Sequence, residues 1–335
     1  MITLHTPNGL DAPVPETPAE DPSPHFDAGQ PEAIKAYYEA NGYVVVSSVL
    51  DRATCDLMRS LWDAEVKPSS APIYRQATAK LEANVRNRQG WVMNPVLNPQ
   101  SVDPTLFPQF RQKARDLVLN SPGLGRILGH LFGERAKIVQ AMYFEGNSAT
   151  WEHQDSYYLD SEQIGSMVGV WFALEDIEPE AGRFFVCPRS HLLDWPRQSL
   201  NDNVADAHEV YIRSVIDKYR ESNSSVRAPA LRKGDTLIWN ALTIHGSLAG
   251  EHEQHSRSSM TCHAIPASHR FLQHQHRVLD VATEDLGNVL LHAPKDQARL
   301  RNRAIRWVEW NFPNAFYAAK RAAVKAALRR NASGT

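Results

Sequence analysis

The sequence predicts an all-β core with flanking helices, of the α+β class, in which the strands form a double-sheet jelly roll of the cupin kind. Helical patterns dominate residues 31–135, whereas short β-branched and aromatic runs bounded by turn residues dominate residues 136–268. Strands are expected over residues 136–144, 165–174, 183–187, 235–239 and 258–265. Many short strands around an enclosed centre are typical of a jelly roll.

Length and composition fit one large globular unit. The chain has 335 residues, of which 42% are hydrophobic, enough for a sizeable core. A formal net charge of -2 gives no argument for a nucleic-acid partner. Cys55, Cys187 and Cys262 are odd in number and widely spaced, which favours a reducing cytoplasm over a disulfide framework. No apolar run approaches the roughly 20 residues that span a membrane, and no signal-peptide pattern is present at the start.

The first third of the chain begins with a proline-rich stretch and then becomes helical. Residues 1–30 combine prolines with acidic and small residues, so we expect a mobile leader that cannot bury enough apolar surface to fold alone. A helix over residues 31–40 follows, with Asn41-Gly42 as its stop. A second helix is expected from Asp51, and an interrupted one over residues 108–132.

These patterns divide the chain into a main domain with additions at both ends. The main domain is expected over residues 31–268, with a helical part over 31–135 and a β core over 136–268. Residues 192–230 are polar, lack a clear strand and resemble an insertion in that core. A basic, partly helical extension is expected over residues 269–335.

The extension is basic and aromatic. Residues 295–330 carry ten Lys and Arg against two acidic residues, and Pro313 divides them into two helical segments. The aromatic residues interleaved with these charges are Trp307, Trp310, Phe312, Phe316 and Tyr317. Three interpretations stay open: a solvated helix that packs its aromatic residues on the barrel, a surface that docks on an anionic membrane or a lipid-like substrate, and a subunit interface.

A histidine and a carboxylate stand two residues apart in the middle of the chain, at His153 and Asp155. In an extended segment such residues point to the same face, so the two side chains converge. A later predicted strand supplies a second imidazole, His245. Two histidines and one carboxylate with open positions opposite are the ligand set of non-haem Fe(II) oxygenases.

Arg257 stands at the start of the next predicted strand. Its planar guanidinium can hold a carboxylate through two parallel hydrogen bonds, as a dicarboxylate cosubstrate requires while its other end chelates the metal. We therefore predict an iron site with Arg257 as the carboxylate anchor. A zinc-dependent hydrolase and a non-catalytic cupin-like binding module remain alternatives for the same pocket, although no positioned glutamate base supports the hydrolase.

Over roughly residues 31–268 the chain is similar to the phytanoyl-CoA dioxygenase (PhyH) family. The motifs that carry the resemblance are Asn41-Gly42-Tyr43-Val44-Val45-Val46, Gln140, His153-Gln154-Asp155, Ala181 to Leu192, Lys233-Gly234-Asp235-Thr236, His245-Gly246-Ser247 and Arg257. The resemblance implies a double-stranded β-helix that uses Fe(II), 2-oxoglutarate and O2 to hydroxylate an unactivated C–H bond, with release of succinate and CO2. Because halogenating relatives replace the carboxylate with a small residue, Asp155 favours hydroxylation.

The resemblance also implies roles for individual residues. The residues similar to the catalytic iron ligands are His153, Asp155 and His245, and those similar to cosubstrate-binding residues are Arg257, Ser247, Trp171 and Gln140. One turn departs from the family, because Pro188-Arg189-Ser190-His191 replaces Pro-Gly-Ser-His. Arg189 therefore has to fit this turn without the freedom of glycine to adopt a positive φ.

The substrate is defined only as a class. We expect a polar or amphiphilic small molecule, either a lipid- or sugar-bearing cell-envelope molecule or a biosynthetic intermediate, with Tyr157, Tyr158 and Arg189 near the entrance. The basic tail favours the first of these and a peripheral membrane contact by a cytoplasmic protein. The oligomeric state stays open.

Overall fold

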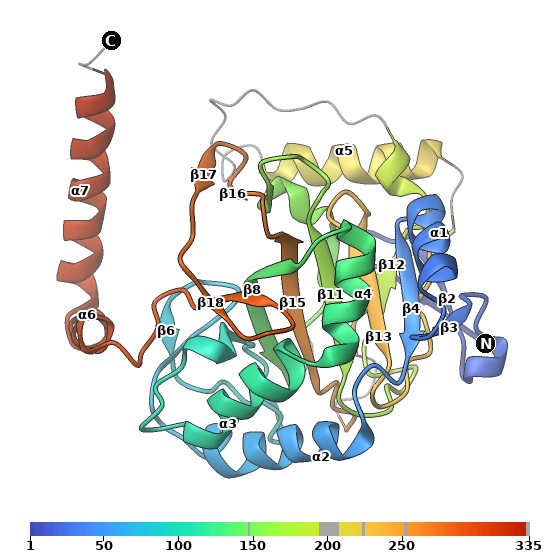
Figure 1. Cartoon of the computed structure of the whole chain (residues 1–335), viewed down its shortest axis with the longest axis horizontal. Coiled ribbons are helices and arrows are strands. Elements are labelled where there is room, and N and C mark those ends of the chain that lie inside the picture. The colour runs from blue at the N-terminus through green and yellow to red at the C-terminus, as the bar shows by residue number, and fades with distance from the viewer. Residues whose placement is uncertain (147, 194–207, 223–224, 251–253, 333–335) are drawn as a thin grey trace.

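A large mixed sheet forms the centre of the computed structural model, which describes residues 1–146, 148–193, 208–222, 225–250 and 254–332 (Figure 1). Its strands lie in the order β18 (Thr283–Asp285), β19 (Leu290–His292), β8 (Ala136–Phe144), β15 (Ser259–Pro266), β11 (Val168–Ala173), β13 (Thr236–Asn240), β4 (Tyr43–Ser47) and β3 (His25–Asp27). The short β7 (Val96–Leu97) also pairs with β8. Each predicted strand of the β core thus begins and ends within three residues of its expected bounds.

A minor sheet lies across a cavity from the large one. It consists of β12 (Phe184–Val186), β14 (His245–Ser247) and β9 (Thr150–His153), in that order. Residues of both sheets line the same cavity. Two sheets around an enclosed centre form the double-sheet jelly roll that the sequence predicts.

The described residues also form three small sheets. They are β1 (Ile2–His5) with β2 (Asp11–Val14), β5 (Ile73–Tyr74) with β6 (Leu81–Glu82), and β10 (Leu159–Ser161) with β16 (Phe271–Gln273) and β17 (Arg277–Leu279). The strands after residue 268 were not expected from the sequence, since each has only three residues. A run this short carries little periodicity.

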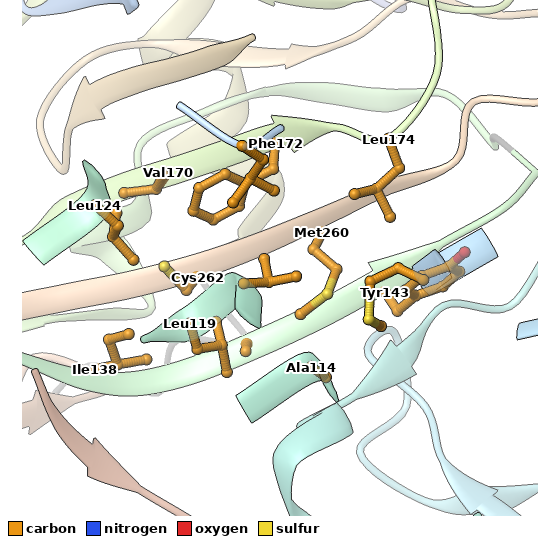
Figure 2. Packing of buried hydrophobic residues seen from close by; sticks show 14 of the residues in the cluster. Ala114, Leu119, Leu124, Ile138, Tyr143, Val170, Phe172, Leu174, Met260 and Cys262 are labelled. Atoms are coloured by element: carbon orange, nitrogen blue, oxygen red, sulfur yellow. The ribbon is translucent and has the colours of Figure 1, made fainter. Parts of the chain in front are cut away.

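Strand alternation separates an apolar face of the large sheet from a face that lines the cavity. Val170 and Phe172 of β11 and Met260 and Cys262 of β15 belong to one buried cluster with helical residues such as Leu124 (Figure 2). The helices over this face are α1 (Pro31–Asn41), α2 (Arg52–Leu61), α3 (Pro108–Lys113) and α4 (Pro122–Phe132). Trp171 lies between Val170 and Phe172 in β11, and Thr261 lies between Met260 and Cys262 in β15. Both point into the cavity, as period-two alternation requires.

The helix boundaries follow the signals in the sequence. Gly42 adopts φ 76° directly after α1, in the left-handed conformation that ends helices. Asp51 caps α2, its side chain accepting a 2.6 Å hydrogen bond from the N–H of Thr54. Between α3 and α4 the chain makes a π-helical turn, and Ser121 caps α4.

The N-terminal segment differs from the expected mobile leader. Its first two strands pair as a hairpin, and Ala12 and Val14 are fully buried in a cluster with Phe185. The side chains of Thr6 and Asn8 also donate hydrogen bonds to the buried carboxylate of Glu152. The average composition concealed a short alternating run that buries one face, so this expectation was wrong.

The expected insertion and tail contain helices. α5 (His208–Glu221) is the described part of the insertion, and residues 194–207 and 223–224 lie outside the described residues. α6 (Leu300–Asn311) and α7 (Pro313–Ala332) meet at Pro313, and α7 stands clear of the body (Figure 1). No helix among the described residues has the length and apolar character to cross a bilayer.

Candidate metal centre

The minor sheet places the two predicted histidines side by side. His153 of β9 is the pairing partner of His245 of β14, and their ring centroids lie 4.3 Å apart. Asp155 follows β9, and its Oδ1 lies 3.8 Å from Nε2 of His153 and 3.5 Å from Nε2 of His245. One ligand atom from each of the three residues lies within 4.8 Å of the others. Two imidazole nitrogens and a carboxylate oxygen at this spacing fit one Fe(II) ion.

Each histidine is oriented by a backbone carbonyl. Nδ1 of His153 lies 2.8 Å from the carbonyl oxygen of Trp151, and Nδ1 of His245 lies 2.9 Å from that of Thr243. Because a carbonyl only accepts, Nδ1 carries the proton and Nε2 keeps its lone pair for a metal. Burial, with a further contribution from His245, lowers the pKa of His153 to about 4. The ring is therefore neutral at neutral pH, which is the form that binds metal.

Two donors hold the other oxygen of Asp155. Nε1 of Trp239 donates a 2.8 Å hydrogen bond to Oδ2, and Nε2 of His263 lies 3.2 Å from the same atom. Burial raises the pKa of Asp155, but the opposing interactions with His245 and His263 set it well below its usual range. The carboxylate is thus ionised, with Oδ1 the oxygen nearest both predicted iron-binding histidines.

Trp239 and His263 are the site residues that the sequence left without a role. Alternation along β15 places His263 on the same face as Thr261, and both line the cavity. The signal for Trp239 lies on the neighbouring strand, where a Cβ built on Gly169 would lie 2.2 Å from Cε2 of the indole. Glycine at this position makes room for the indole that reaches Asp155.

Arg257 is a buried cation on the cavity wall, only 3% exposed. Its Nη1 donates a 2.8 Å hydrogen bond to the carbonyl of Gly182, while its Nε has no hydrogen-bond partner among the described residues. Burial lowers the pKa of Arg257 to about 9. Since no carboxylate of the described residues forms an ion pair with it, a bound carboxylate would compensate a costly buried charge.

The other expected cosubstrate residues line the same cavity. Oγ of Ser247 accepts a 3.0 Å hydrogen bond from the N–H of Thr150, and the Trp171 ring centroid lies 6.0 Å from Cζ of Arg257. Gln140 of β8 is the pairing partner of His263. The structure therefore gathers all seven predicted iron- and cosubstrate-binding residues around one space.

The three expected substrate contacts do not lie together. Tyr158 lines the cavity, with its ring edge-on to His153 at 5.8 Å. Tyr157 is buried in an apolar cluster and stacks on Tyr211 of α5 at 3.7 Å, because its side chain points away from the cavity. Arg189 lies at a separate surface hollow and adopts φ 67°. The last two residues therefore do not form part of the cavity wall.

The cavity extends well beyond the metal ligands, with a volume of about 890 Å³. Its apolar wall includes Ile73, Leu81, Leu97, Val102, Phe107 and Met142. Lys295 and Arg306, from the C-terminal extension, also line it. This volume lies in the upper range of ligand sites, so the cavity has room for a substrate beside a small cosubstrate.

Comparison with solved structures supports the fold. The epimerase SnoN, in complex with Fe3+, alpha-ketoglutarate and nogalamycin RO, aligns with a TM-score of 0.54 and 18% identity, over 78% of this chain and 98% of SnoN. The alpha-ketoglutarate-dependent carbocyclase SnoK aligns with a TM-score of 0.53 and 19% identity, over 73% of this chain and 86% of SnoK.

Sequence comparison identifies relatives and a family. The chain is 24% identical to peroxisomal phytanoyl-CoA dioxygenase of Bos taurus over 71% of this chain and 69% of that protein. It is 27% identical to phytanoyl-CoA dioxygenase domain-containing protein 1 of Mus musculus over 45% of this chain, so the match spans about half, 52%, of the mouse protein. The family model for phytanoyl-CoA dioxygenase (PhyH) matches residues 38–258. His153, Asp155 and His245 could together hold a metal ion, and the chain belongs to the phytanoyl-CoA dioxygenase family.

Proposed function

We propose that the protein is a dioxygenase that hydroxylates an unactivated C–H bond of a polar or amphiphilic small molecule, using Fe(II), 2-oxoglutarate and O2. The observation that carries the proposal is that one cavity holds both a three-ligand centre and a buried arginine that forms no ion pair with the carboxylates of the described residues. A dicarboxylate that chelates the metal at one end requires such a cation at the other.

The residues of the chain contribute binding and orientation. His153, Asp155 and His245 would hold the metal on one side, and the carbonyls behind the histidines keep both Nε2 atoms unprotonated. Arg257, with the hydroxyl of Ser247 nearby on the wall, would bind the distal carboxylate of 2-oxoglutarate. Bound iron and cosubstrate supply the oxidising power, with release of succinate and CO2.

The residues that line the cavity support the proposal of an amphiphilic substrate. One stretch of the wall is aliphatic and aromatic, which favours a hydrocarbon portion. Lys295 lies 3.9 Å above the ring of Tyr74, and Arg306 pairs with Asp103 at 2.9 Å. Both cations belong to the same cavity, where they suit an anionic or strongly polar head group.

Succinate formation from 2-oxoglutarate tests the proposal without knowledge of the substrate. The purified protein with Fe(II) in air should convert 2-oxoglutarate slowly to succinate, and His153→Ala and Asp155→Ala should abolish the reaction. His5→Ala, a solvent-exposed histidine outside the cavity, is the control and should retain the wild-type rate. Unchanged turnover in the ligand variants would contradict the proposal, as would a protein that binds zinc and hydrolyses substrates without producing succinate.

A further inference from the structure

The helix α6 contacts the body of the protein through its polar side. Arg306 Nη2 lies 2.9 Å from Oδ2 of the buried Asp103, and Arg303 Nε lies 3.6 Å from the same oxygen. The hydroxyl of Tyr74 donates a 2.8 Å hydrogen bond to Glu309, which is 4% exposed. A helix that packs on a globular body normally presents its apolar side to it. In α6 this arrangement is reversed.

The large apolar residues of α6 and its C-terminal cap are left partly exposed to solvent. Trp307 is 60% exposed, Trp310 44% and Phe312 54%. We call this set the α6 surface; its members are Leu300, Ile305, Trp307, Val308, Trp310 and Phe312. Isolated exposed apolar residues are common, but six of them lie within residues 300–312, and the rings of Trp307 and Phe312 are in contact at 5.8 Å. Such a concentration marks an interaction site. The first interpretation of the tail, with its aromatic residues packed on the barrel, is therefore wrong for Trp307, Trp310 and Phe312.

The charges next to the α6 surface are almost all positive. Residues 295–330 carry a net charge of +8, from ten basic and two acidic residues, and the rest of the chain carries -10. Both acidic groups are already engaged by the fold, since Asp296 pairs with Arg111 at 2.8 Å and Glu309 accepts from Tyr74 and Tyr317. On α7, Lys320 and Arg321 are exposed. Arg303 and Arg306 are paired with Asp103, and the exposed basic residues that remain, such as Lys320 and Arg321, are available to an external partner.

We propose that the α6 surface docks on an anionic lipid membrane. A helix lying in the membrane interface buries an aromatic and aliphatic side, while nearby Lys and Arg are attracted to anionic head groups. Tryptophan is the side chain most suited to that depth, because its ring is apolar and its N–H stays near water. The surface has both features, and α7 stands clear of the body beside it (Figure 1).

A second copy of the chain is a less favourable partner for the α6 surface than a membrane. A two-fold interface places the same patch of both subunits together, so it would bring two segments of charge +8 into contact. Like charges across an interface cost several kcal/mol by order of magnitude. An anionic membrane offers the opposite charge over the whole surface.

The position of α6 relates docking to the source of the substrate. Arg306 of α6 lines the cavity that contains the metal ligands, so the helix that carries the α6 surface borders that cavity through its polar side. A docked protein could then take an amphiphilic substrate with an anionic head group directly from the bilayer. This consequence rests on the proposed function, whereas docking itself does not.

Sedimentation with vesicles tests the docking on the metal-free full chain. We expect binding to vesicles made from equal parts of phosphatidylglycerol and phosphatidylcholine, and at least roughly tenfold weaker binding to phosphatidylcholine alone. Trp307→Ala with Trp310→Ala should weaken binding roughly tenfold or more. Lys320→Gln with Arg321→Gln should weaken it by a similar factor, since each basic residue contributes roughly fivefold.

Matched controls replace exposed residues of the same kinds elsewhere. Leu192→Ala with Val210→Ala removes two apolar side chains at least 60% exposed, and Arg52→Gln with Arg126→Gln removes two exposed charges on α2 and α4. Both controls should bind vesicles like the wild type. Equal losses in the controls, or no sedimentation of the wild type with anionic vesicles, would overturn the proposal.

The molecular mass in solution shows whether a second copy of the chain binds the α6 surface. A dimer that becomes a monomer in the Trp307→Ala, Trp310→Ala variant would assign the surface to another copy and overturn membrane docking. Because vesicle binding needs neither iron nor 2-oxoglutarate, its failure is distinct from a failure of the oxygenase proposal, which succinate formation measures.

Discussion

Nε1 of Trp239 donates a 2.8 Å hydrogen bond to Oδ2 of Asp155, and Oδ1 of the same carboxylate is the oxygen nearest both His153 and His245. The indole thus separates the two oxygens by function. One oxygen is fixed by the protein, and the other remains for the metal. Outer hydrogen bonds of this kind orient ligands and typically contribute 10–100-fold to metal affinity by order of magnitude.

Removing the indole donor should loosen the carboxylate. We expect Trp239→Phe to lower the affinity for Fe(II), or for Co(II) as a spectroscopic probe, by roughly 10–100-fold while the fold is retained. Trp62→Phe is the matched control, because Trp62 is equally buried but its Nε1 has no hydrogen-bond partner among the described residues. Equal metal affinity in the two variants, measured by anaerobic titration, would contradict the role of Trp239.

The second donor can be exchanged for a similar one. Nε2 of His263 lies 3.2 Å from Oδ2 of Asp155, and a glutamine amide can donate from nearly the same position. We expect His263→Gln to keep metal affinity within a few-fold of the wild type and His263→Leu to lower it roughly tenfold or more. If leucine and glutamine had the same effect, His263 would only fill space.

Asp160 should make stability depend on pH. Burial raises the pKa of this carboxyl to about 6, although the side chain of Ser156 and the backbone N–H groups of Ser161, Gly165 and Met167 oppose the shift. Since the folded pKa exceeds the unfolded value, the folded state binds the proton more tightly. The resulting stabilisation is complete below about pH 4 and is lost as pH rises through about 6, by roughly 3 kcal/mol.

Denaturant unfolding of the wild type and Asp160→Asn at several pH values measures this effect. The variant cannot titrate at this position, so groups common to both proteins cancel in the difference. We expect the wild type to lose stability relative to the variant between about pH 4 and 7. A difference that stays constant over this range would rule out the assignment to Asp160.

Arg189 should be replaceable by glycine with a gain in stability. Its φ of 67° lies in the left-handed region, which costs a non-glycine residue roughly 1–2 kcal/mol. Arg189→Gly removes this cost but adds freedom to the unfolded chain, so we expect a net gain of roughly 0.5–1 kcal/mol. Arg189→Ala keeps the Cβ and should show no such gain. A destabilised glycine variant in denaturant unfolding would contradict this account.

Much of the fold was predictable because the long elements carry strong local signals. The nine residues of β8 and the eight of β15 give clear strand patterns, and the Asp51 cap and the Gly42 stop mark helix ends directly. The hairpin at the N-terminus was hidden, since a four-residue strand such as Asp11–Val14 depends on distant partners for its burial.

At the site, residue type was more informative than position. Two histidines and a carboxylate indicate a metal wherever they meet, and the strand register brings them together as predicted. The roles of Trp239 and His263 depend on which side chains face each other across three adjacent strands, and no local pattern reports this. No signal in the sequence indicated that Tyr157 would stack on Tyr211 and not line the cavity, because Tyr211 lies on a helix about fifty residues later in the chain.

The visible spectrum of the anaerobic protein with Fe(II) and 2-oxoglutarate tests the central claim most directly. A cosubstrate that chelates iron and is anchored by Arg257 should give a weak charge-transfer band, which Arg257→Ala should remove at the same 2-oxoglutarate concentration. No band in the wild type, or an equally strong band with equal 2-oxoglutarate affinity in Arg257→Ala, would contradict the iron and 2-oxoglutarate site described above.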